Sequence, residues 1–432
     1  MSRLLLSRPF MPCCLLLAVL LRLGWVLAVD ASPVDDFAWY HDRAVGIAAG
    51  DGVANHGVPT AYWPAGYPMI LGALYALFGS SVRVAQAANI VLSVATVALT
   101  WLLGRRLLDS EAAGRIAALV LAVWPNQIAY MTLTATETVF SCVLMAGMLL
   151  WLRKDASPAH ALLTGGMFGL ATLIRPQAAL LPAFAAMAWW LLDGRPRPRA
   201  GALLRGVFLH IGLGLALIPW TVRNYQVFGE VIFVANSGGI NLLIGNNPKA
   251  TGGYMDVPEL LAEPDERGRD ALAARWATQY IRSHPWEALA KVPHKLRHLY
   301  DKDVEGFYWN EVAMGKGEGA PRERPLWGLK LAAQGFWIAL LAVVCVGLVR
   351  SLISGIPDPP GPAAFYSGWM VILYFTMVFM VLFGSSRFHH PMAPWLSMYA
   401  AAALAPLLRP SALRREAAVA MPRPRVTEKV LR

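Results

Sequence analysis

The sequence FMPCCLLLAVLLRLGWVLAVDASPVDDFAWYHDR, residues 10–43, passes directly from a long apolar run to a pair of carboxylates. A helix of about 20 apolar residues crosses a hydrocarbon core roughly 30 Å thick, and residues 10–29 have that length. Asp35 and Asp36 follow at once, beside aromatic side chains. This order predicts a membrane-spanning helix whose far end opens into a polar segment equipped for chemistry.

The composition of the whole chain places it in a membrane. Of its 432 residues 56% are hydrophobic and 15% are charged, and the mean hydropathy is +0.46. These values exclude an ordinary soluble domain and are typical of a multi-span membrane protein. The net charge of +11 is spread over the ends of apolar runs, so it indicates orientation in a bilayer and not nucleic-acid binding. The four cysteines lie inside apolar runs, which argues against a disulfide framework or a zinc site.

Further apolar windows long enough to span a membrane recur along the chain and predict an all-α polytopic fold with about ten transmembrane helices. The windows are 10–29, 84–104, 111–130, 133–152, 160–174, 177–193, 201–220, 327–349, 363–383 and 389–408. Two are marginal, because 160–174 is short and 111–130 contains Pro125. The apolar piece 68–78 is only about half a span and predicts an interfacial or re-entrant helix.

The basic residues orient these spans. With the N-terminus in the cytoplasm and 68–78 not crossing, every short inside loop is basic, as the positive-inside rule requires. If 68–78 crossed, the bias would invert. The inside residues are Arg3, Arg8, Arg105, Arg106, Arg153, Lys154, the run RPRPR at 195–199, Arg350, Arg414 and Arg415. A cleaved signal peptide is the alternative for the first span, but its apolar core is longer than the usual ~7–15 residues, which favours an uncleaved anchor.

This topology divides the chain into four parts. Residues 1–220 form an N-terminal membrane core with the first outer loop at 30–83, and residues 221–326 form an extracytoplasmic loop domain. Residues 327–408 supply the last transmembrane helices, and 409–432 form a basic cytoplasmic tail. Most of the polar material therefore lies outside, and we expect the chemistry there.

Charged residues converge on that outer face. Asp35 and Asp36 follow the first span, Glu137 lies about one turn into the fourth, Arg175 joins the fifth and sixth, and Arg387 precedes the last. A charge at membrane depth costs on the order of 2.5–3.5 kcal/mol near the bilayer centre, so such residues tend to line a polar cavity. These acids and arginines on one side therefore predict a cavity.

Structural roles compete with each of these assignments. For Arg175 and Arg387 the alternative interpretation is that their side chains reach lipid headgroups at helix ends. For Glu137 the alternative is a buried ion pair with an arginine. Arg22, inside the first span, is interpreted as a structural partner or as a side chain that reaches toward the interface, and not as a catalytic residue. One of the two adjacent aspartates can cap the helix that begins there while the other reacts, and we expect Asp35 to cap or orient that helix.

Several short motifs occur in a fixed order along nearly the whole chain. They are Asp36-x-x-x-Tyr40-His41, TAYWPAGYP at 60–68, TETVF at 136–140, Arg175-Pro176, Arg223-Asn224-Tyr225 followed by VFGEVIFVANSGGINLLIGNN at 227–247, and Arg387-Phe388-x-x-Pro391-x-x-Pro394. Each is weak alone. In this order they resemble the bacterial family 39 glycosyltransferases, relatives of the protein O-mannosyltransferases and of the aminoarabinose transferase that modifies lipid A.

The resemblance implies a GT-C glycosyltransferase fold in the bacterial cytoplasmic (inner) membrane, with the active site on the extracytoplasmic face. Such enzymes pass a sugar from a polyprenyl phosphate to a lipid, polysaccharide or protein acceptor. The family's acidic residue in the first outer loop falls on Asp36, because Tyr40 follows it by four, and this implies that Asp36 is the general base. Here Phe37 follows that acid where the family has a second one, so the adjacent acid is Asp35 instead.

The proposed chemistry suits these residue types. An aspartate that takes the proton of an acceptor hydroxyl contributes roughly 10²–10⁴ in rate, and Glu137 is the second catalytic candidate. The departing phosphate needs cations, for which Arg175, Lys295 and Arg387 are candidates, although a solvated basic face is an equal reading for Lys295. The expected substrate-binding residues are Asp35, Tyr40, His41, Tyr62, Tyr67 and Arg223; for the tyrosines at 62 and 67 an interfacial aromatic belt is the alternative.

No cluster has metal-ligand spacing, but a divalent cation, Mg²⁺ or Mn²⁺, shared by Asp36 and Glu137 is left open as a cofactor. The expected partners are a polyprenyl-phosphate-linked sugar, its acceptor and the bilayer, with no nucleic acid. The rival function is a transporter or flippase of a lipid-linked or small polar substrate. That class typically shows internal repeats and charges near the midplane, whereas this chain has its acids at the outer edge.

Overall fold

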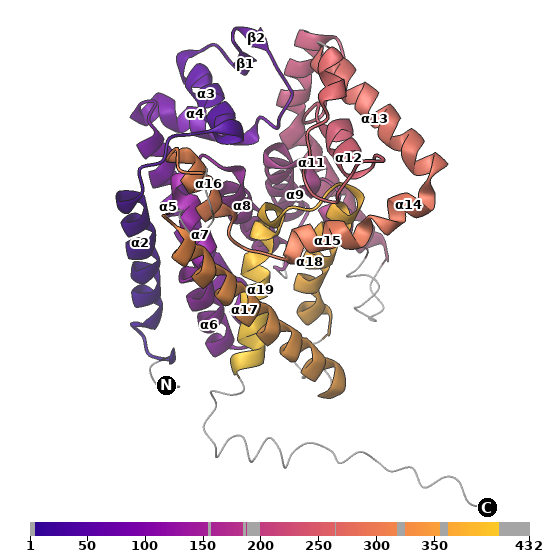
Figure 1. Cartoon of the computed structure of the whole chain (residues 1–432). Coiled ribbons are helices and arrows are strands. Elements are labelled where there is room, and N and C mark those ends of the chain that lie inside the picture. The colour runs from indigo at the N-terminus through magenta and orange to yellow at the C-terminus, as the bar shows by residue number, and fades with distance from the viewer. Residues whose placement is uncertain are drawn as a thin grey trace, which may run out of the picture.

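The computed structural model describes residues 5–153, 157–184, 187, 199–263, 265–317, 325–354 and 362–405. Within them the regular structure is helical apart from one short antiparallel hairpin, β1 (Ala54–Asn55) with β2 (Val58–Pro59) (Figure 1). The predicted all-α class is confirmed. The predicted tail at 409–432 lies outside the described residues.

The helices follow one another with short connections. The first half contains α2 (Phe10–Ala28), α3 (Asp35–Ala49), α4 (Gly66–Phe78), α5 (Val82–Leu107), α6 (Glu111–Ala122), α7 (Pro125–Ala129), η1 (Tyr130–Thr132), α8 (Thr136–Trp151), α9 (Pro158–Ile174) and η2 (Pro176–Ala178). The second half contains α11 (Arg199–Phe228), α12 (Gly238–Gly245), η3 (Pro258–Ala262), α13 (Glu266–Ser283), α14 (Pro285–Ala290), α15 (Val292–Tyr300), α16 (Glu305–Ala313), α17 (Trp327–Ser354), α18 (Pro362–Val381), η5 (Ser386–Met392) and α19 (Ala393–Leu404).

Four of the described helices are long and apolar enough to cross a membrane on their own: α2, α5, and the segments Leu203–Phe228 of α11 and Trp327–Ile353 of α17. Each lies on a predicted window. Helix α9 and the segment Tyr366–Val381 of α18 are apolar but shorter, and most of the predicted window 177–193 lies outside the described residues. Helix α4 has 13 residues, as expected for a half-span.

The predicted span 111–130 is wrong as a single helix. Helix α6 ends after 12 residues, and a new helix, α7, starts at Pro125. Proline fits the first turn of a helix, and it disfavours helical backbone in the residue before it, so the chain turns here. The segment Pro125–Thr132 then meets α8 at a bend of 119°. This bend carries the start of α8, with Glu137, into the interior.

The helices pack into one bundle, in which α9 lies along α11, α5 along α6 and α8, and α17 along α19. Arg22 of α2 is fully buried in this bundle. Its guanidinium donates to Ser93 Oγ at 2.7 Å and to the Ala122 carbonyl at 2.9 Å, where α6 ends. The interpretation of Arg22 as a structural partner is therefore confirmed.

One end of the bundle carries the polar elements. Helices α3, α4 and α13 and the hairpin lie at the upper end in Figure 1, whereas α2 begins and α19 ends at the lower end. Helix α3 lies across α4. The segment 30–83, which the sequence predicts to be the first outer loop, thus covers this end of the bundle. The first turn of α3 holds the two aspartates.

Candidate active site

Arg387 of η5 lies between the two candidate catalytic acids. Its Nη1 donates to Asp36 Oδ2 at 2.7 Å, and its Nε donates to Glu137 Oε1. The planar guanidinium presents donors in fixed directions, which lets one side chain hold two carboxylates. The first outer loop, α8 and the segment before α19 therefore meet at one guanidinium.

Arg175 completes this group of four charges. Its Nη2 lies 3.4 Å from the same Glu137 Oε1, so the buried carboxylate is shared by two arginines. The Glu137 side chain is fully buried, whereas the side chains of Arg175 and Arg387 are 11% and 12% exposed. The buried ion pair considered for Glu137 is what the structure contains, and this explains how a carboxylate is tolerated inside the bundle. The side chains of both arginines are engaged by Glu137, which argues against the lipid-headgroup alternative.

Aromatic rings flank the two arginines. Arg387 lies 4.8 Å from the centroid of the Phe37 ring, and Arg175 lies 5.6 Å from that of Phe388. A guanidinium over a ring face is attracted by the ring's quadrupole, more strongly where water is excluded. These ring contacts hold the two guanidiniums in place in addition to their ion pairs.

Asp36 is the open member of the group. The Asp36 side chain is 30% exposed, whereas the Glu137 side chain is fully buried. Both aspartates lie in the first turn of α3, where a negative charge is stabilised by the helix dipole. Asp36 is therefore an acid that a substrate can reach while it remains held by Arg387.

The helix cap assigned to Asp35 is wrong in detail. The N-cap residue of α3 is Val34, and it makes no side-chain capping hydrogen bond. Asp35 instead adopts a left-handed backbone with φ of 49°, a conformation that Asp and Asn tolerate better than most residues. Partial burial, and then the charge of Asp36, raise the pKa of Asp35. Asp35 thus sets the turn into α3.

The predicted aromatic residues form a wall beside the acids. Tyr40 is buried, with its ring centroid 5.7 Å from that of Trp63 and 5.6 Å from that of Tyr67. Tyr62 also packs against Trp63, with the two ring centroids 5.3 Å apart. The hydroxyl of Tyr67 is buried and has no hydrogen-bond partner among the described residues. Three of the expected substrate-binding residues, Tyr40, Tyr62 and Tyr67, are therefore brought together.

Two other expected substrate-binding residues hold the fold instead. His41 Nδ1 lies 2.7 Å from the hydroxyl of Tyr75 and joins α3 to α4. Arg223 donates to the carbonyls of Val53 at 2.7 Å and Thr60 at 3.1 Å. The His41 contact holds two helices of the segment 30–83 together, and the Arg223 contacts fasten that segment to α11. Both side chains are thus satisfied by partners within the fold.

Lys295 does not join the arginines. It is buried, and its ammonium donates to Asn246 Oδ1, the Met380 carbonyl and the Val381 carbonyl at 3.0, 3.1 and 3.1 Å. An ammonium has three donors, so all three are used. The two carbonyls end α18, where a positive charge is favourable. The prediction that Lys295 holds a phosphate is replaced by a structural role.

The carboxylates of Asp36 and Glu137 do not form a metal site. The guanidinium of Arg387 lies between them and takes the place that a shared cation would need. Within the described ranges, no three His, Cys, Asp or Glu side chains are grouped to hold a metal ion. A shared Mg²⁺ or Mn²⁺ therefore does not fit these two residues as arranged.

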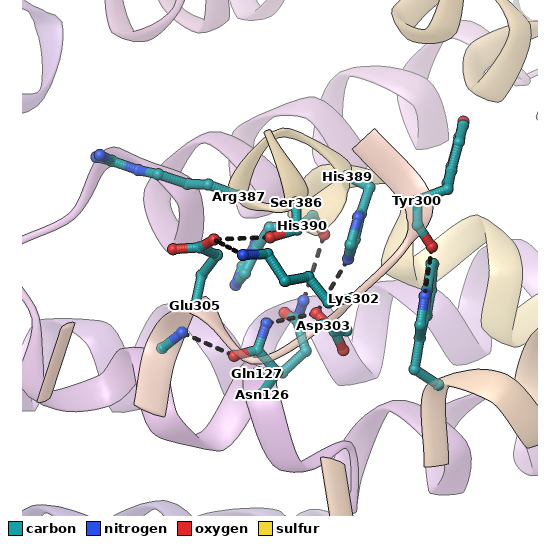
Figure 2. A network of polar contacts seen from close by, with 12 residues as sticks. Asn126, Gln127, Tyr300, Lys302, Asp303, Glu305, Ser386, Arg387, His389 and His390 are labelled. Atoms are coloured by element: carbon teal, nitrogen blue, oxygen red, sulfur yellow. Dashed lines mark hydrogen bonds and ion pairs between the residues drawn. The ribbon is translucent and has the colours of Figure 1, made fainter. Parts of the chain in front are cut away.

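A buried pair that the sequence did not predict, Asp303 with His389, lies next to the four-charge group. Asp303, between α15 and α16, is buried and lies 3.0 Å from His389 Nε2 of η5. Figure 2 shows His389 pointing toward Asp303, while Arg387 extends away from it. No local signal separates Asp303 from the neighbouring Asp301, because both stand in the same polar turn.

The chain matches the model of the family described as dolichyl-phosphate-mannose-protein mannosyltransferase over residues 63–222. This stretch includes Glu137 and Arg175 and ends just before Arg223. No protein of curated function matches the chain by sequence. The resemblance to this group of glycosyltransferases is confirmed by the family match.

Solved structures share the fold. The oligosaccharyltransferase of Archaeoglobus fulgidus in its apo form matches with a TM-score of 0.55 and 14% identity, over 96% of this chain and 53% of that one. The same enzyme, AglB, in complex with an inhibitory peptide and a dolichol-phosphate, matches with a TM-score of 0.55 and 15% identity, over 95% and 51%. The chain spans about half the length of these archaeal enzymes and has their GT-C fold.

ArnT from Cupriavidus metallidurans, bound to undecaprenyl phosphate, matches with a TM-score of 0.40 and 17% identity. That match covers 92% of this chain and 77% of ArnT.

Proposed function

We propose that the protein is an integral membrane glycosyltransferase that moves a sugar from a polyprenyl-phosphate donor to an extracytoplasmic acceptor, with Asp36 as general base. The observation that carries the proposal is the four-charge group of Asp36, Arg387, Glu137 and Arg175. It combines one reachable carboxylate with two arginines at the polar end of a GT-C bundle.

The geometry suggests how the reaction would proceed. Oδ2 of Asp36 is held by Arg387, which leaves Oδ1 to take the proton of an acceptor hydroxyl. The acceptor oxygen then bonds to the anomeric carbon, and the bond from that carbon to the phosphate oxygen breaks. The electron pair of the broken bond leaves with the phosphate. Donors of Arg387 and Arg175 that Glu137 does not use would stabilise the growing phosphate charge.

The other residues have supporting roles in this proposal. Glu137 fixes the two arginines in position, because its carboxylate contacts both. The wall of Tyr40, Trp63 and Tyr67 offers apolar faces to a sugar ring or to the prenyl chain. The GT-C relatives support a lipid-linked donor, since one solved structure of AglB contains a dolichol-phosphate. We assign the enzyme to the bacterial inner membrane, with the site on the outer face.

A reconstitution assay tests this function. Purified protein in vesicles receives a polyprenyl phosphate that carries a radiolabelled sugar, together with extracts of envelope lipid, polysaccharide and protein. Transfer of label to an acceptor, with release of polyprenyl phosphate, supports the transferase, and Asp36→Asn is the inactive control. Movement of the intact donor between leaflets without transfer would indicate the flippase instead.

The acceptor is identified by a separate comparison. Mass spectrometry of envelope glycolipids and glycoproteins, from cells with and without the gene, would show which molecule loses a sugar. An envelope that is the same in both strains would contradict a role in its glycosylation.

A further inference from the structure

The short helix η5 has three side-chain faces. In a 3₁₀ helix three residues make one turn, so residues three apart share a face. Ser386, His389 and Met392 form one such face and all contact the segment 299–305. Ser386 Oγ donates to Glu305 Oε1 at 2.8 Å, and the Tyr300 hydroxyl donates to Met392 Sδ at 3.4 Å. The two ring nitrogens of His389 lie 2.6 Å from the Leu299 carbonyl oxygen and 3.0 Å from Asp303 Oδ1.

The next face of the same helix carries Arg387 and His390. Arg387 reaches Asp36 and Glu137, and His390 Nδ1 lies 3.4 Å from Ser141 Oγ, one turn further along α8. Figure 2 shows Arg387 and His389 leaving η5 in different directions, with His389 pointing toward Asp303. Because one short helix carries both faces, the contacts of His389 on one face set the direction of the Arg387 side chain on the other face.

The hydrogen bonds of His389 fix where its protons are. Nδ1 faces the Leu299 carbonyl, which can only accept, so Nδ1 carries a hydrogen. Nε2 faces Asp303 Oδ1, so one further proton lies between that nitrogen and that oxygen. The remaining question is which of the two atoms holds it.

The surroundings of Asp303 favour the carboxylate form. The Trp124 indole N–H can only donate, and it lies 2.5 Å from Asp303 Oδ2. The amide nitrogen of Asn126 donates to Oδ1, and its orientation is fixed because its oxygen accepts the Gly306 N–H at 2.8 Å. Donors on both oxygens stabilise the ionised carboxylate.

The surroundings of His389 favour the cation. Its ring stacks on Trp337, with centroids 4.4 Å apart and planes 8° apart, and on Tyr300 at 6.3 Å and 4°. Aromatic faces attract a cation, most strongly away from water. The side chains of His389 and Asp303 keep 1% and 2% of their exposure, so bulk water does not screen the pair.

We propose that His389 is an imidazolium paired with the Asp303 carboxylate, and that this pair is a positioning element which directs Arg387 onto Asp36 and Glu137. The protonation state stands independently of the enzyme's reaction, whereas the positioning role rests on the proposed glycosyltransferase function. In this role the pair acts through Arg387.

Nitrogen-15 NMR of the intact protein, labelled in its nine histidines, tests the protonation state. The His389 signal is the one that disappears in His389→Gln. We expect both of its ring nitrogens to carry hydrogen at neutral pH, and we expect one bare nitrogen in Asp303→Asn. A bare ring nitrogen at His389 in the unaltered protein would overturn the ion pair.

A second variant guards against misfolding. Trp337→Leu leaves both charged partners in place but removes the stacked ring, so it should shift the same signal by loss of the ring current. If neither His389→Gln nor Asp303→Asn folds, this shift identifies His389. The protonation of the two His389 ring nitrogens in the unaltered protein then shows whether the ion pair is present.

Donor kinetics test the positioning role. Asp303→Asn should raise the KM for the polyprenyl-phosphate sugar more than it lowers kcat, with a loss in kcat/KM of up to about 100-fold, as expected when a binding group is displaced. The control is His160→Gln, which alters another buried histidine whose Nε2 lies 2.8 Å from the Leu150 carbonyl. Unchanged donor KM in folded Asp303→Asn would overturn the role. Absence of transfer by the unaltered protein would refute the proposed function alone, since the NMR result does not depend on activity.

Discussion

Arg387 donates to Asp36 at 2.7 Å across 351 positions of sequence, and the same guanidinium is bound to the buried Glu137. The proposed base is therefore attached to the group proposed to hold the phosphate. Proton removal from the acceptor and charge stabilisation on the leaving group would then occur around one side chain, which keeps the reacting groups at a fixed spacing.

Replacing Asp36 separates its role as base from its role in the ion pair. Asp36→Asn keeps the size of the side chain but cannot take a proton, so transfer should fall by roughly two orders of magnitude or more while the protein still folds. The matched control is Asp35→Asn, because asparagine tolerates the left-handed backbone at that position. Radiolabel transfer by folded protein is the measurement. Near-normal transfer by Asp36→Asn would refute the assignment, and an inactive Asp35→Asn would move the base by one residue.

Glu137 should contribute mainly to stability. Glu137→Gln leaves the guanidiniums of Arg175 and Arg387 close together without their shared carboxylate, and breaking a buried pair in this way typically costs about 3–5 kcal/mol. Thermal unfolding in detergent should therefore show a large drop in midpoint. The double variant Glu137→Gln with Arg175→Gln removes one positive charge as well and should recover part of the loss. Equal stability of Glu137→Gln and the unaltered protein would contradict this account.

Arg387 should not be replaceable by lysine. A lysine ammonium is a single point and cannot span Asp36 and Glu137 as the planar guanidinium does. We expect Arg387→Lys to lower kcat/KM for the donor roughly 10- to 100-fold, which corresponds to one charge-assisted hydrogen bond of about 1.5–3 kcal/mol. The control is Arg83→Lys, since the Arg83 side chain is 60% exposed in its pair with Asp30. Similar donor kinetics for the two variants would remove Arg387 from the phosphate site.

Lys295 should make stability depend on alkaline pH. Burial, helped by the charge of Lys291, lowers the pKa of Lys295 from 10.5 to about 8, so between these values the unfolded chain binds the proton and the folded chain does not. The free energy of unfolding of the unaltered protein, relative to Lys295→Met, should be constant below pH 8 and rise from pH 8 to about 10.5. Denaturation in detergent at several pH values measures this difference. Lys249→Met, at a position whose side chain is 75% exposed, is the control variant.

The outer location of residues 221–326 remains a prediction from charge. In a background without the native cysteines, Ser283→Cys, at the exposed end of α13, should react with an impermeant thiol reagent in intact spheroplasts. Arg414→Cys, in the basic tail, should react only after lysis. The opposite pattern would place the four-charge group on the cytoplasmic face and would contradict an extracytoplasmic acceptor.

The sequence by itself determined the helical membrane bundle, the half-length helix at 68–78 and the four charged residues of the candidate site. These are local properties. The length of an apolar run sets whether a helix can span, and a charge within such a run is costly wherever the run is placed. Asp36, Glu137, Arg175 and Arg387 were therefore visible as candidates without any knowledge of their neighbours.

Only the tertiary structure decided which partner each long side chain meets. Lys295 and Arg387 are both basic residues beside apolar helices, yet one binds the carbonyls that end α18 and the other joins two carboxylates. The burial of Asp303 against His389 likewise has no local signal. These pairings depend on how helices distant in sequence pack, because a charged side chain in a dry interior must use the acceptors that the packing places within its reach.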